Sequence, residues 1–307
     1  MPELVTSGCY YSLHYVSQRV GVPSAARRSF VQRQDDGMDS SMKAMKLYER
    51  VERIHNELAL LEIDAEAPLT VEQLTPFDNY HYFGTEAVDE AIVTLGLKPG
   101  MRVLDIGSGI GGPARYIAER SGAHVTALEL QPDLDTLAAD FTKRCGLADL
   151  VEHRCGDILD GLDETYDAVV SFLCFLHVAD RPRLLATCRG VLAAGGALYI
   201  EDYAKRREPT AAEAAALEVK VQCRSLPSAA HYEAQLRTAG FVDIEVEDVT
   251  EQWTRFTAGR LEEFRARRER NVAVHGLDIV DGLDDFYSTV AGLFATGAIT
   301  GLKIVAR

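Results

Sequence analysis

Residues 103–113 read VLDIGSGIGGP, and this stretch decides the fold of the chain. An apolar run ends in Asp105, continues into a glycine cluster, and leads into the helical pattern of residues 114–118. This order predicts a strand, a tight turn and the start of a helix. Glycine is required where the backbone takes a positive φ or where a ligand touches the main chain. The N-terminus of a helix offers free N–H groups and a partial positive charge, so we expect a ligand with a carboxylate, phosphate or ribose there.

Two kinds of ligand fit the glycine cluster. Gly107, Gly109 and Gly112 satisfy the G-x-G-x-x-G pattern of dinucleotide-binding folds. Glu129 ends the next apolar run, at residues 124–128, where an acid holds ribose hydroxyls in such folds. The glycines and this acid do not by themselves separate a dinucleotide from another nucleoside ligand.

The order of the later features separates the two ligands. Asp157 follows a polar segment at residues 151–154, a buried-strand pattern follows at 166–171, and a glycine turn precedes another strand within 191–200. In this register the chain resembles the class I S-adenosylmethionine (SAM) methyltransferases over about residues 78–205. The resemblance implies that SAM is the cofactor.

Strands and helices alternate through about residue 205, which is typical of an α/β doubly wound parallel sheet. Further strand patterns occur at 241–246 and 300–305. The resemblance implies a Rossmann-like seven-stranded sheet with an N-terminal helical extension and a helical insertion before the last strand. We expect a leader or disordered segment at 1–35, a helical cap at 36–85, and a SAM-binding domain at 86–307 whose insertion, 252–297, covers the acceptor.

The N-terminal segment has an unusual charge pattern. Residues 4–34 contain no acid but several arginines and serines, a profile typical of a mitochondrial transit peptide. A disordered or wrongly assigned start explains the pattern equally well. The expected location is therefore the cytoplasm, or the mitochondrial matrix if the segment is a transit peptide.

Composition excludes several classes of partner. The net charge of −15 leaves no basic surplus for nucleic acid, and no apolar run approaches the roughly 20 residues of a membrane span. The six cysteines form no C-x-x-C pair, so we expect neither a metal site nor a disulfide framework. The amphipathic pattern at 39–62 predicts a helix that packs on the core or on a second copy of the chain, which leaves a homodimer open.

The resemblance assigns roles around the cofactor. Glu129 is expected to accept hydrogen bonds from the ribose hydroxyls, Asp157 from the adenine amino group, and Asp105 to organise the glycine turn or bind the methionine amino group. The remaining expected cofactor residues are Gly107, Gly109, Gly111, Leu130, Ile158 and Phe172.

The acceptor end offers a histidine and an acid. His177 and Asp202 follow the fourth and fifth expected strands, at the sheet edge where ligands of open α/β sheets bind. In similar small-molecule O-methyltransferases, a His and an Asp at these places act as base and partner, and histidine is a natural base near neutral pH. Alternatively, His177 caps its helix or packs beside SAM.

The layout most resembles the sarcosine/dimethylglycine N-methyltransferases, which share the helical extension, the aromatic segment and the insertion. A tertiary amine acceptor needs aromatic faces rather than a base. The residues that could supply them are Tyr80, Tyr82, Phe83, Trp253 and Tyr287, although such residues more often belong to the core. Arg224 or Arg255 could hold a substrate carboxylate, although an arginine is more often a surface residue. The expected function is SAM-dependent methylation of a small polar metabolite, on nitrogen. The alternative is O- or S-methylation of a small hydroxy or thio acid, with His177 as the base for oxygen.

Overall fold

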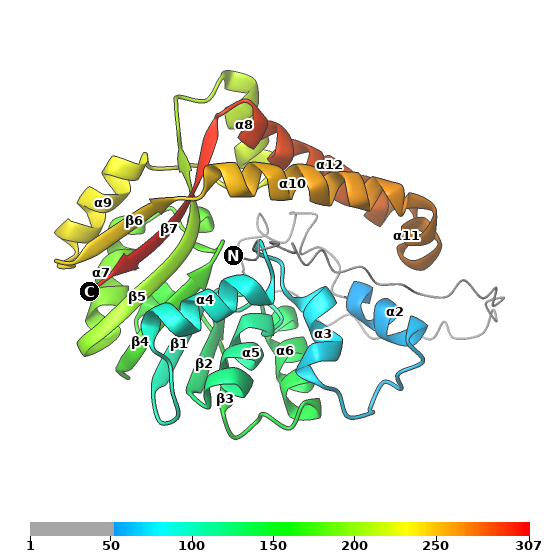
Figure 1. Ribbon diagram of the computed structural model, residues 1–307, viewed down its shortest axis with the longest axis horizontal. Helices are drawn as coiled ribbons and strands as arrows, with labels where there is room; N and C mark the ends of the chain where they lie inside the picture. Colours follow the sequence, from blue (N-terminus) through cyan, green and yellow to red (C-terminus); the bar gives the residue numbers. More distant parts are fainter. Residues whose placement is uncertain (1–51) are drawn as a thin grey trace, which may run out of the picture. The chain divides into compact units, whose positions relative to one another are not determined.

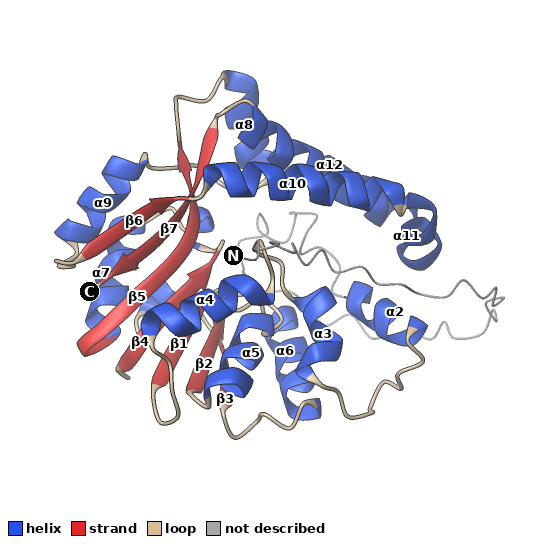
Figure 2. Ribbon diagram, in the orientation of Figure 1, coloured by secondary structure: helices blue, strands red, loops and turns tan. Residues whose placement is uncertain are grey.

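The computed structural model describes residues 52–307, which form a seven-stranded sheet with helices on both faces (Figures 1 and 2). The expected leader at 1–35 and the first part of the expected helix at 39–62 lie outside the described residues. The described part of that helix is α2 (Glu52–Leu60). No helix within the described range is both long and apolar enough to cross a membrane.

The sheet has the strand order of the expected doubly wound fold. Its order is β3-β2-β1-β4-β5-β7-β6, in which β7 alone runs antiparallel to its neighbours. The strands are β1 (Arg102–Ile106), β2 (His124–Glu129), β3 (Val151–Cys155), β4 (Tyr166–Phe172), β5 (Leu192–Lys205), β6 (Ile244–Asp248) and β7 (Ile299–Ala306). The predicted fold class is confirmed.

One strand begins later than the sequence suggested. The pattern at 241–246 predicted a strand from Phe241, but β6 begins at Ile244. The N–H of Phe241 donates to the carbonyl of Leu236 at the end of a helix, and its side chain is buried in the core. Phe241 is therefore apolar because it packs in the core after the end of that helix, and not because it belongs to a strand.

Helices cover the two faces of the sheet. The α-helices besides α2 are α3 (Val71–Asp78), α4 (Thr85–Leu95), α5 (Gly112–Ser121), α6 (Pro132–Arg144), α7 (Arg181–Val191), α8 (Ala211–Lys220), α9 (Ala229–Thr238), α10 (Thr250–Ala266), α11 (Arg268–His275) and α12 (Leu277–Ala295). Alternate residues of β1 face opposite sides: Val103 packs in a cluster with α4 and α5, whereas Leu104 packs in a cluster with α7 and α9. Burial on both faces is typical of parallel strands between helical layers.

A third cluster of buried residues forms beside α8, α10 and α12. It joins Tyr82 and Tyr203 to Trp253 of α10 and Phe294 of α12. Helices α10, α11 and α12 lie between β6 and β7 in the chain, and Figure 1 shows α10 and α12 running side by side. This cluster forms a wall of the functional site described below.

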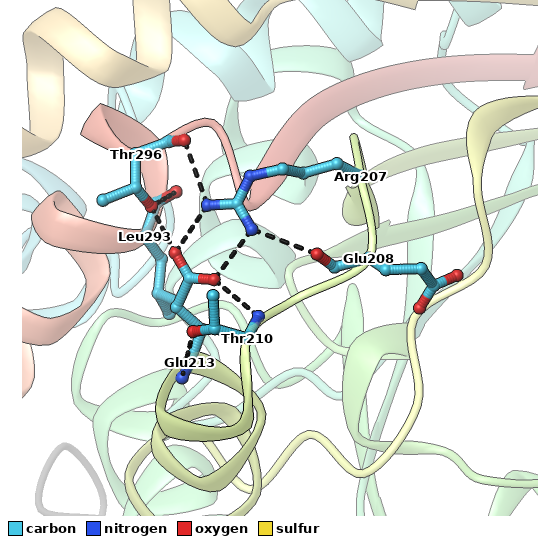
Figure 3. Close-up of polar contacts among 6 residues, drawn as sticks. All are labelled: Arg207, Glu208, Thr210, Glu213, Leu293 and Thr296. Atoms are coloured by element: carbon cyan, nitrogen blue, oxygen red, sulfur yellow. Dashed lines mark hydrogen bonds and ion pairs between the residues drawn. The ribbon is translucent and has the colours of Figure 1, made fainter.

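A polar anchor fixes α8 to the end of α12 (Figure 3). Glu213 accepts two hydrogen bonds from the guanidinium of Arg207, at 2.8 and 2.7 Å, and one from the hydroxyl of Thr296 at 2.8 Å. It also forms a capping box with Thr210 at the start of α8. The contact with Arg207 holds the pKa of Glu213 well below its usual range. We call Arg207, Thr210, Glu213 and Thr296 the Glu213 anchor.

Candidate active site

Two adjoining pockets lie at the carboxyl ends of β1 and β4. The two pockets share five lining residues, which are Gly107, Gly109, Phe172, Leu173 and His177. The pocket that also includes Glu129, Leu130, Asp157 and Ile158 is called the acid pocket here. The one that also includes Asp78, Tyr80, Tyr82, Tyr203 and Arg260 is called the aromatic pocket. Carboxyl ends of parallel strands are the usual ligand site of open α/β sheets.

Gly107 lies between the two pockets and must be glycine. Its φ is +74°, and a Cβ atom there would lie 2.2 Å from Sγ of Cys174. Its N–H donates to the carbonyl of Leu128 at 2.9 Å. The backbone turn after β1 therefore packs directly against the segment that follows β4. Gly107 lines both pockets at this contact.

Glu129 lies at the end of β2 and lines the acid pocket. Its carboxylate accepts hydrogen bonds from the N–H groups of Gly109 at 2.8 Å and Gln131 at 2.9 Å. Burial raises its pKa to about 7. A carboxylate can accept about four hydrogen bonds, so these two contacts fix the side chain and leave capacity for hydroxyl donors of a ligand.

Asp157 and Ile158 lie in the acid pocket as predicted. Asp157 accepts a hydrogen bond from the N–H of Leu159 at 2.8 Å, which caps a short 3₁₀-helix at Ile158–Asp160. Ile158 is buried and, with Leu130 and Leu134, gives the pocket apolar surface. Flat apolar walls beside a carboxylate suit a purine ring that carries an amino group.

Asp105 lies at the rim of the aromatic pocket, near the end of β1. Burial raises its pKa to about 7, and the charge of Glu129 adds to the rise. Its Oδ2 atom and Oγ of Ser108 are buried without a hydrogen-bond partner in the described chain. A buried polar atom without a partner is costly, so both atoms point to a bound donor group.

Gly111 packs beneath the glycine loop and does not line either pocket. It caps the N-terminus of α5 with a φ of +79° and lies outside the lining of both pockets. A Cβ atom there would lie 2.7 Å from Nη1 of Arg115. The resemblance implied a cofactor contact at Gly111, whereas the structure gives it a packing role beneath the loop.

His177 lies at the junction of the two pockets, on the 3₁₀-helix η2 (Phe175–His177). Its Nδ1 atom lies 3.3 Å from the main-chain oxygen of Gln222. A carbonyl can only accept, so Nδ1 carries the proton and Nε2 the lone pair of the neutral ring. Burial lowers the pKa of His177 to about 4, which keeps the ring neutral at physiological pH.

Asp202 departs from the arrangement expected of a catalytic partner. Its side chain is fully buried and does not line either pocket. It accepts hydrogen bonds from Arg181 at 3.0 Å, from the hydroxyl of Tyr232 at 3.1 Å and from the N–H of Leu176 at 3.1 Å. The expectation of an acid at the end of the strand was wrong, because β5 continues to Lys205 and places Asp202 within it. Asp202 therefore supports η2 from below.

Tyr80 and Tyr82 line the aromatic pocket, but Trp253 does not. The Tyr82 hydroxyl hydrogen-bonds to that of Tyr203. The Trp253 ring packs edge-on against Tyr82 at a centroid distance of 4.8 Å and is only 2% exposed. It also fills the space over Gly301, where a Cβ atom would lie 2.4 Å from the ring. Trp253 is therefore the support behind the wall and not part of its surface.

Arg260 lines the aromatic pocket and was missed in the sequence. Its guanidinium lies 4.6 Å from the ring centroid of Tyr287 and 4.9 Å from that of Tyr82. Its Nε atom is buried without a hydrogen-bond partner in the described chain. Arg224 and Arg255, which were considered for a substrate carboxylate, are exposed and pair with Glu218 and Glu251. Nothing in the charge-rich sequence of α10 distinguishes Arg260 from its neighbours.

Comparison with known proteins agrees with this geometry. Residues 104–200 match the family model described as a methyltransferase domain. The chain therefore contains a class I SAM-dependent methyltransferase domain, of which the family model covers residues 104–200. The Haemonchus contortus phosphoethanolamine N-methyltransferase 2, solved with phosphomonomethylethanolamine and S-adenosylhomocysteine, superposes with a TM-score of 0.69 at 23% identity, over 75% of this chain and 54% of that one. A putative sarcosine dimethylglycine methyltransferase from Galdieria sulphuraria gives 0.67 at 17% identity, over 83% and 98%.

Curated relatives of the methyltransferase domain are longer than this chain. Phosphoethanolamine N-methyltransferase 1 of Arabidopsis thaliana is 30% identical over 192 residues, which are 62% of this chain and 38% of that protein. The glycine/sarcosine/dimethylglycine N-methyltransferase of Actinopolyspora halophila is 30% identical over 201 residues, 65% of this chain and 35% of that protein. The chain thus spans well under half the length of either relative.

The residues of the methyltransferase domain fit SAM. The acid pocket offers Glu129 for ribose hydroxyls and Asp157 with Ile158 for adenine. The partnerless Oδ2 atom of Asp105 suits an ammonium group such as that of the methionine part. Within residues 52–307, no cluster of three or more side chains could hold a metal ion.

Proposed function

We propose that the protein transfers the methyl group of SAM to the nitrogen of a small amine that also carries an anionic group. The observation that carries this proposal is the guanidinium of Arg260 in the aromatic pocket, next to the acid pocket. The relatives named for phosphoethanolamine and for glycine, sarcosine and dimethylglycine support it, since each of those compounds is an amine with a phosphate or carboxylate.

Charges of both signs face the aromatic pocket. Arg260 comes from α10 and Asp78 from the end of α3. Arginine matches the geometry of carboxylate and phosphate, and its contacts with Tyr82 and Tyr287 hold its plane in place. A zwitterionic acceptor would set its anionic end at Arg260 and its nitrogen toward the loop at Gly107.

Aromatic side chains suit the nitrogen end. Tyr80, Tyr82 and Tyr203 line the same pocket, and the faces of their rings stabilise a cationic nitrogen. The same side chains exclude water from the reacting atoms. When bound, SAM supplies a methyl group already activated by its sulfonium.

His177 provides the proton acceptor where one is needed. Every amine must be neutral before its lone pair can attack the methyl group of SAM. When the N–C bond has formed, a primary or secondary amine has become an ammonium that still carries a proton, and Nε2 of the neutral His177 can accept that proton at the junction of the pockets. A tertiary amine becomes a quaternary ammonium, which has no N–H proton to lose. The alternative function, O-methylation of a small hydroxy acid, would use the same histidine to deprotonate a hydroxyl.

The test is methyl transfer from labelled SAM to a panel of acceptors. We expect transfer to at least one of phosphoethanolamine, glycine, sarcosine and dimethylglycine, and little to ethanolamine, which lacks the anion. Arg260→Gln should raise KM for the anionic amine by tenfold or more, in line with loss of a charged hydrogen bond worth about 1.5–3 kcal/mol. Arg255→Gln, an exposed arginine of the same helix, is the matched control. Transfer to hydroxy or thio acids alone would refute the proposal.

A further inference from the structure

A buried ion pair links the aromatic pocket to α5, the helix that follows the glycine loop at residues 107–112. Asp78 ends α3 and lines the aromatic pocket, and its Oδ2 atom accepts a hydrogen bond from Nη2 of Arg115 at 2.8 Å. Arg115 belongs to α5, which begins where the glycine loop ends. The two side chains are 1% and 0% exposed. Removing one partner of such a pair leaves an uncompensated buried charge.

Arg115 also supports the loop from beneath. Its Nη1 atom donates to the carbonyl of Ala138 at 3.3 Å and to the hydroxyl of Thr142 at 3.4 Å, both on α6. The same atom occupies the space below Gly111. The position of the guanidinium therefore determines where the end of the glycine loop can lie.

Asp78 touches the loop directly as well. A Cβ atom on Gly112 would lie 2.4 Å from the main-chain oxygen of Asp78, so only glycine admits this approach. Asp78 thus contacts the loop twice: through its carbonyl at Gly112, and through its carboxylate and Arg115 below Gly111. Both contacts come from the side of the acceptor.

We infer that Asp78 is a positioning residue that sets the cofactor loop 107–112 from the acceptor side, through Arg115 and Gly112. The inference rests on the proposed function for the assignment of the two pockets. It follows that a change at Asp78 alters the affinity for SAM through the loop, whose Gly107 and Gly109 line both pockets. Substitutions in a contact network that links two sites typically change the coupling between them by roughly 2- to 30-fold.

The experiment measures SAM binding by calorimetry, on the full chain and without acceptor. Asp78→Asn should weaken SAM binding by about tenfold, within the range typical of substitutions in such a network. The matched control is Asp89→Asn. Asp89 of α4 accepts a hydrogen bond at 3.0 Å from the hydroxyl of Tyr116, which, like Arg115, belongs to α5. Asp89 lines neither pocket. The control should bind SAM within twofold of the wild type. Unchanged affinity in Asp78→Asn, or an equal loss in Asp89→Asn, would overturn the inference.

A second variant covers the case in which Asp78→Asn does not fold. Arg115→Lys keeps the charge opposite Asp78 but loses the planar fork that reaches α6. This variant should also weaken SAM binding. The double variant, with both substitutions, should bind SAM no more weakly than the single variant with the lower affinity, because the two residues act through one contact. Additive losses would contradict this. Since no acceptor is present, failure to methylate any amine would refute the proposed function and leave this measurement valid.

Discussion

Gln222 holds its main-chain oxygen 3.3 Å from Nδ1 of His177, and it does so from a left-handed backbone conformation with a φ of +53°. Such a conformation costs a residue other than glycine about 1–3 kcal/mol and persists where the surrounding structure enforces it. The contact defines which nitrogen of His177 carries the proton. The strained residue thus presents the basic nitrogen of the ring away from Gln222.

The first prediction separates proton removal from positioning. His177→Ala should lower kcat for sarcosine, a secondary amine, about 10²–10⁴-fold, because general-base catalysis contributes about that much. The loss for dimethylglycine, a tertiary amine, should be much smaller. SAM affinity measured by calorimetry should stay close to that of the wild type. Full activity of the variant with sarcosine would end the role of His177 as a base.

The pH dependence of the same histidine follows from its lowered pKa. His177 titrates at about 4 in the folded chain and at about 6.5 when unfolded, so its neutral form persists through the physiological range. Its contribution to stability is complete above pH 6.5 and is lost as the pH falls toward 4. The buried His81 and the half-buried His153, whose pKa values burial also lowers to about 4, act in the same direction. Urea unfolding midpoints between pH 7 and pH 4 should show the loss.

The second prediction concerns cofactor binding and pH. Burial raises the pKa values of Asp105 and Glu129 to about 7, so both are partly protonated in the free protein at neutral pH. The ammonium and sulfonium of SAM favour the ionised carboxylates, and the affinity for SAM should therefore rise from pH 6 to pH 8 with release of protons. Calorimetry in two buffers of different ionisation enthalpy measures the protons released. Asp105→Asn should flatten the profile.

The third prediction concerns Glu129 itself. Glu129→Ala removes the proposed acceptor for ribose hydroxyls and the observed acceptor for the N–H groups of Gly109 and Gln131. We expect SAM binding to weaken by roughly 2–4 kcal/mol, counting about 1.5–3 for each charged hydrogen bond and allowing for non-additivity. Glu152→Ala, an exposed acid on β3, is a suitable control. Unchanged SAM affinity in Glu129→Ala would refute the ribose assignment.

The sequence predicted the site residues near strand ends better than those that tertiary packing brings in from distant parts of the chain. Glu129, Asp157 and Gly107 lie at strand ends, where the chain pattern alone determines the position of each side chain, and these residues do line the acid pocket. Arg260 and Tyr203 reach the aromatic pocket only through the packing of α10 and β5, which no local pattern encodes. Trp253 was misplaced for the same reason, since its partner Gly301 is far away in the sequence.

The fourth prediction tests the aromatic faces. Tyr80→Ala and Tyr82→Ala should lower kcat/KM for dimethylglycine by about 2–30-fold, the effect of a cation–π contact worth about 0.5–2 kcal/mol. Tyr82→Phe keeps the ring and loses only the hydroxyl contact with Tyr203, so it should retain most of the activity. Trimethylglycine, a cation with a carboxylate, should inhibit the wild type. Full activity of both alanine variants would rule out a role for these rings.

The fifth prediction concerns a contact between α2 and α11. Glu57 of α2 accepts hydrogen bonds from Arg270 and, at 2.8 Å, from Nε2 of His275, both on α11. Burial opposes ionisation, but the two basic partners hold the pKa of Glu57 at about 2. Its contribution to stability is therefore fully present above pH 4.5 and is lost as the pH falls from 4.5 toward 2. Glu57→Gln should lower Tm at pH 7, because it removes the charge that pairs with Arg270 and His275, while Glu62→Gln should leave Tm unchanged.

The insertion of α10, α11 and α12 between β6 and β7 has an evolutionary consequence. Arg260 and Phe286 enter the aromatic pocket from this insertion, whereas the acid pocket is built from β1, β2, β4 and the segments that follow β1–β4. The Glu213 anchor attaches the end of the insertion to α8 and does not touch either pocket. With the acceptor in the aromatic pocket, as proposed, exchange of residues 250–295 between homologous chains should change the acceptor preference and leave the methyl donor the same, which makes this segment a unit for recombination and for redesign.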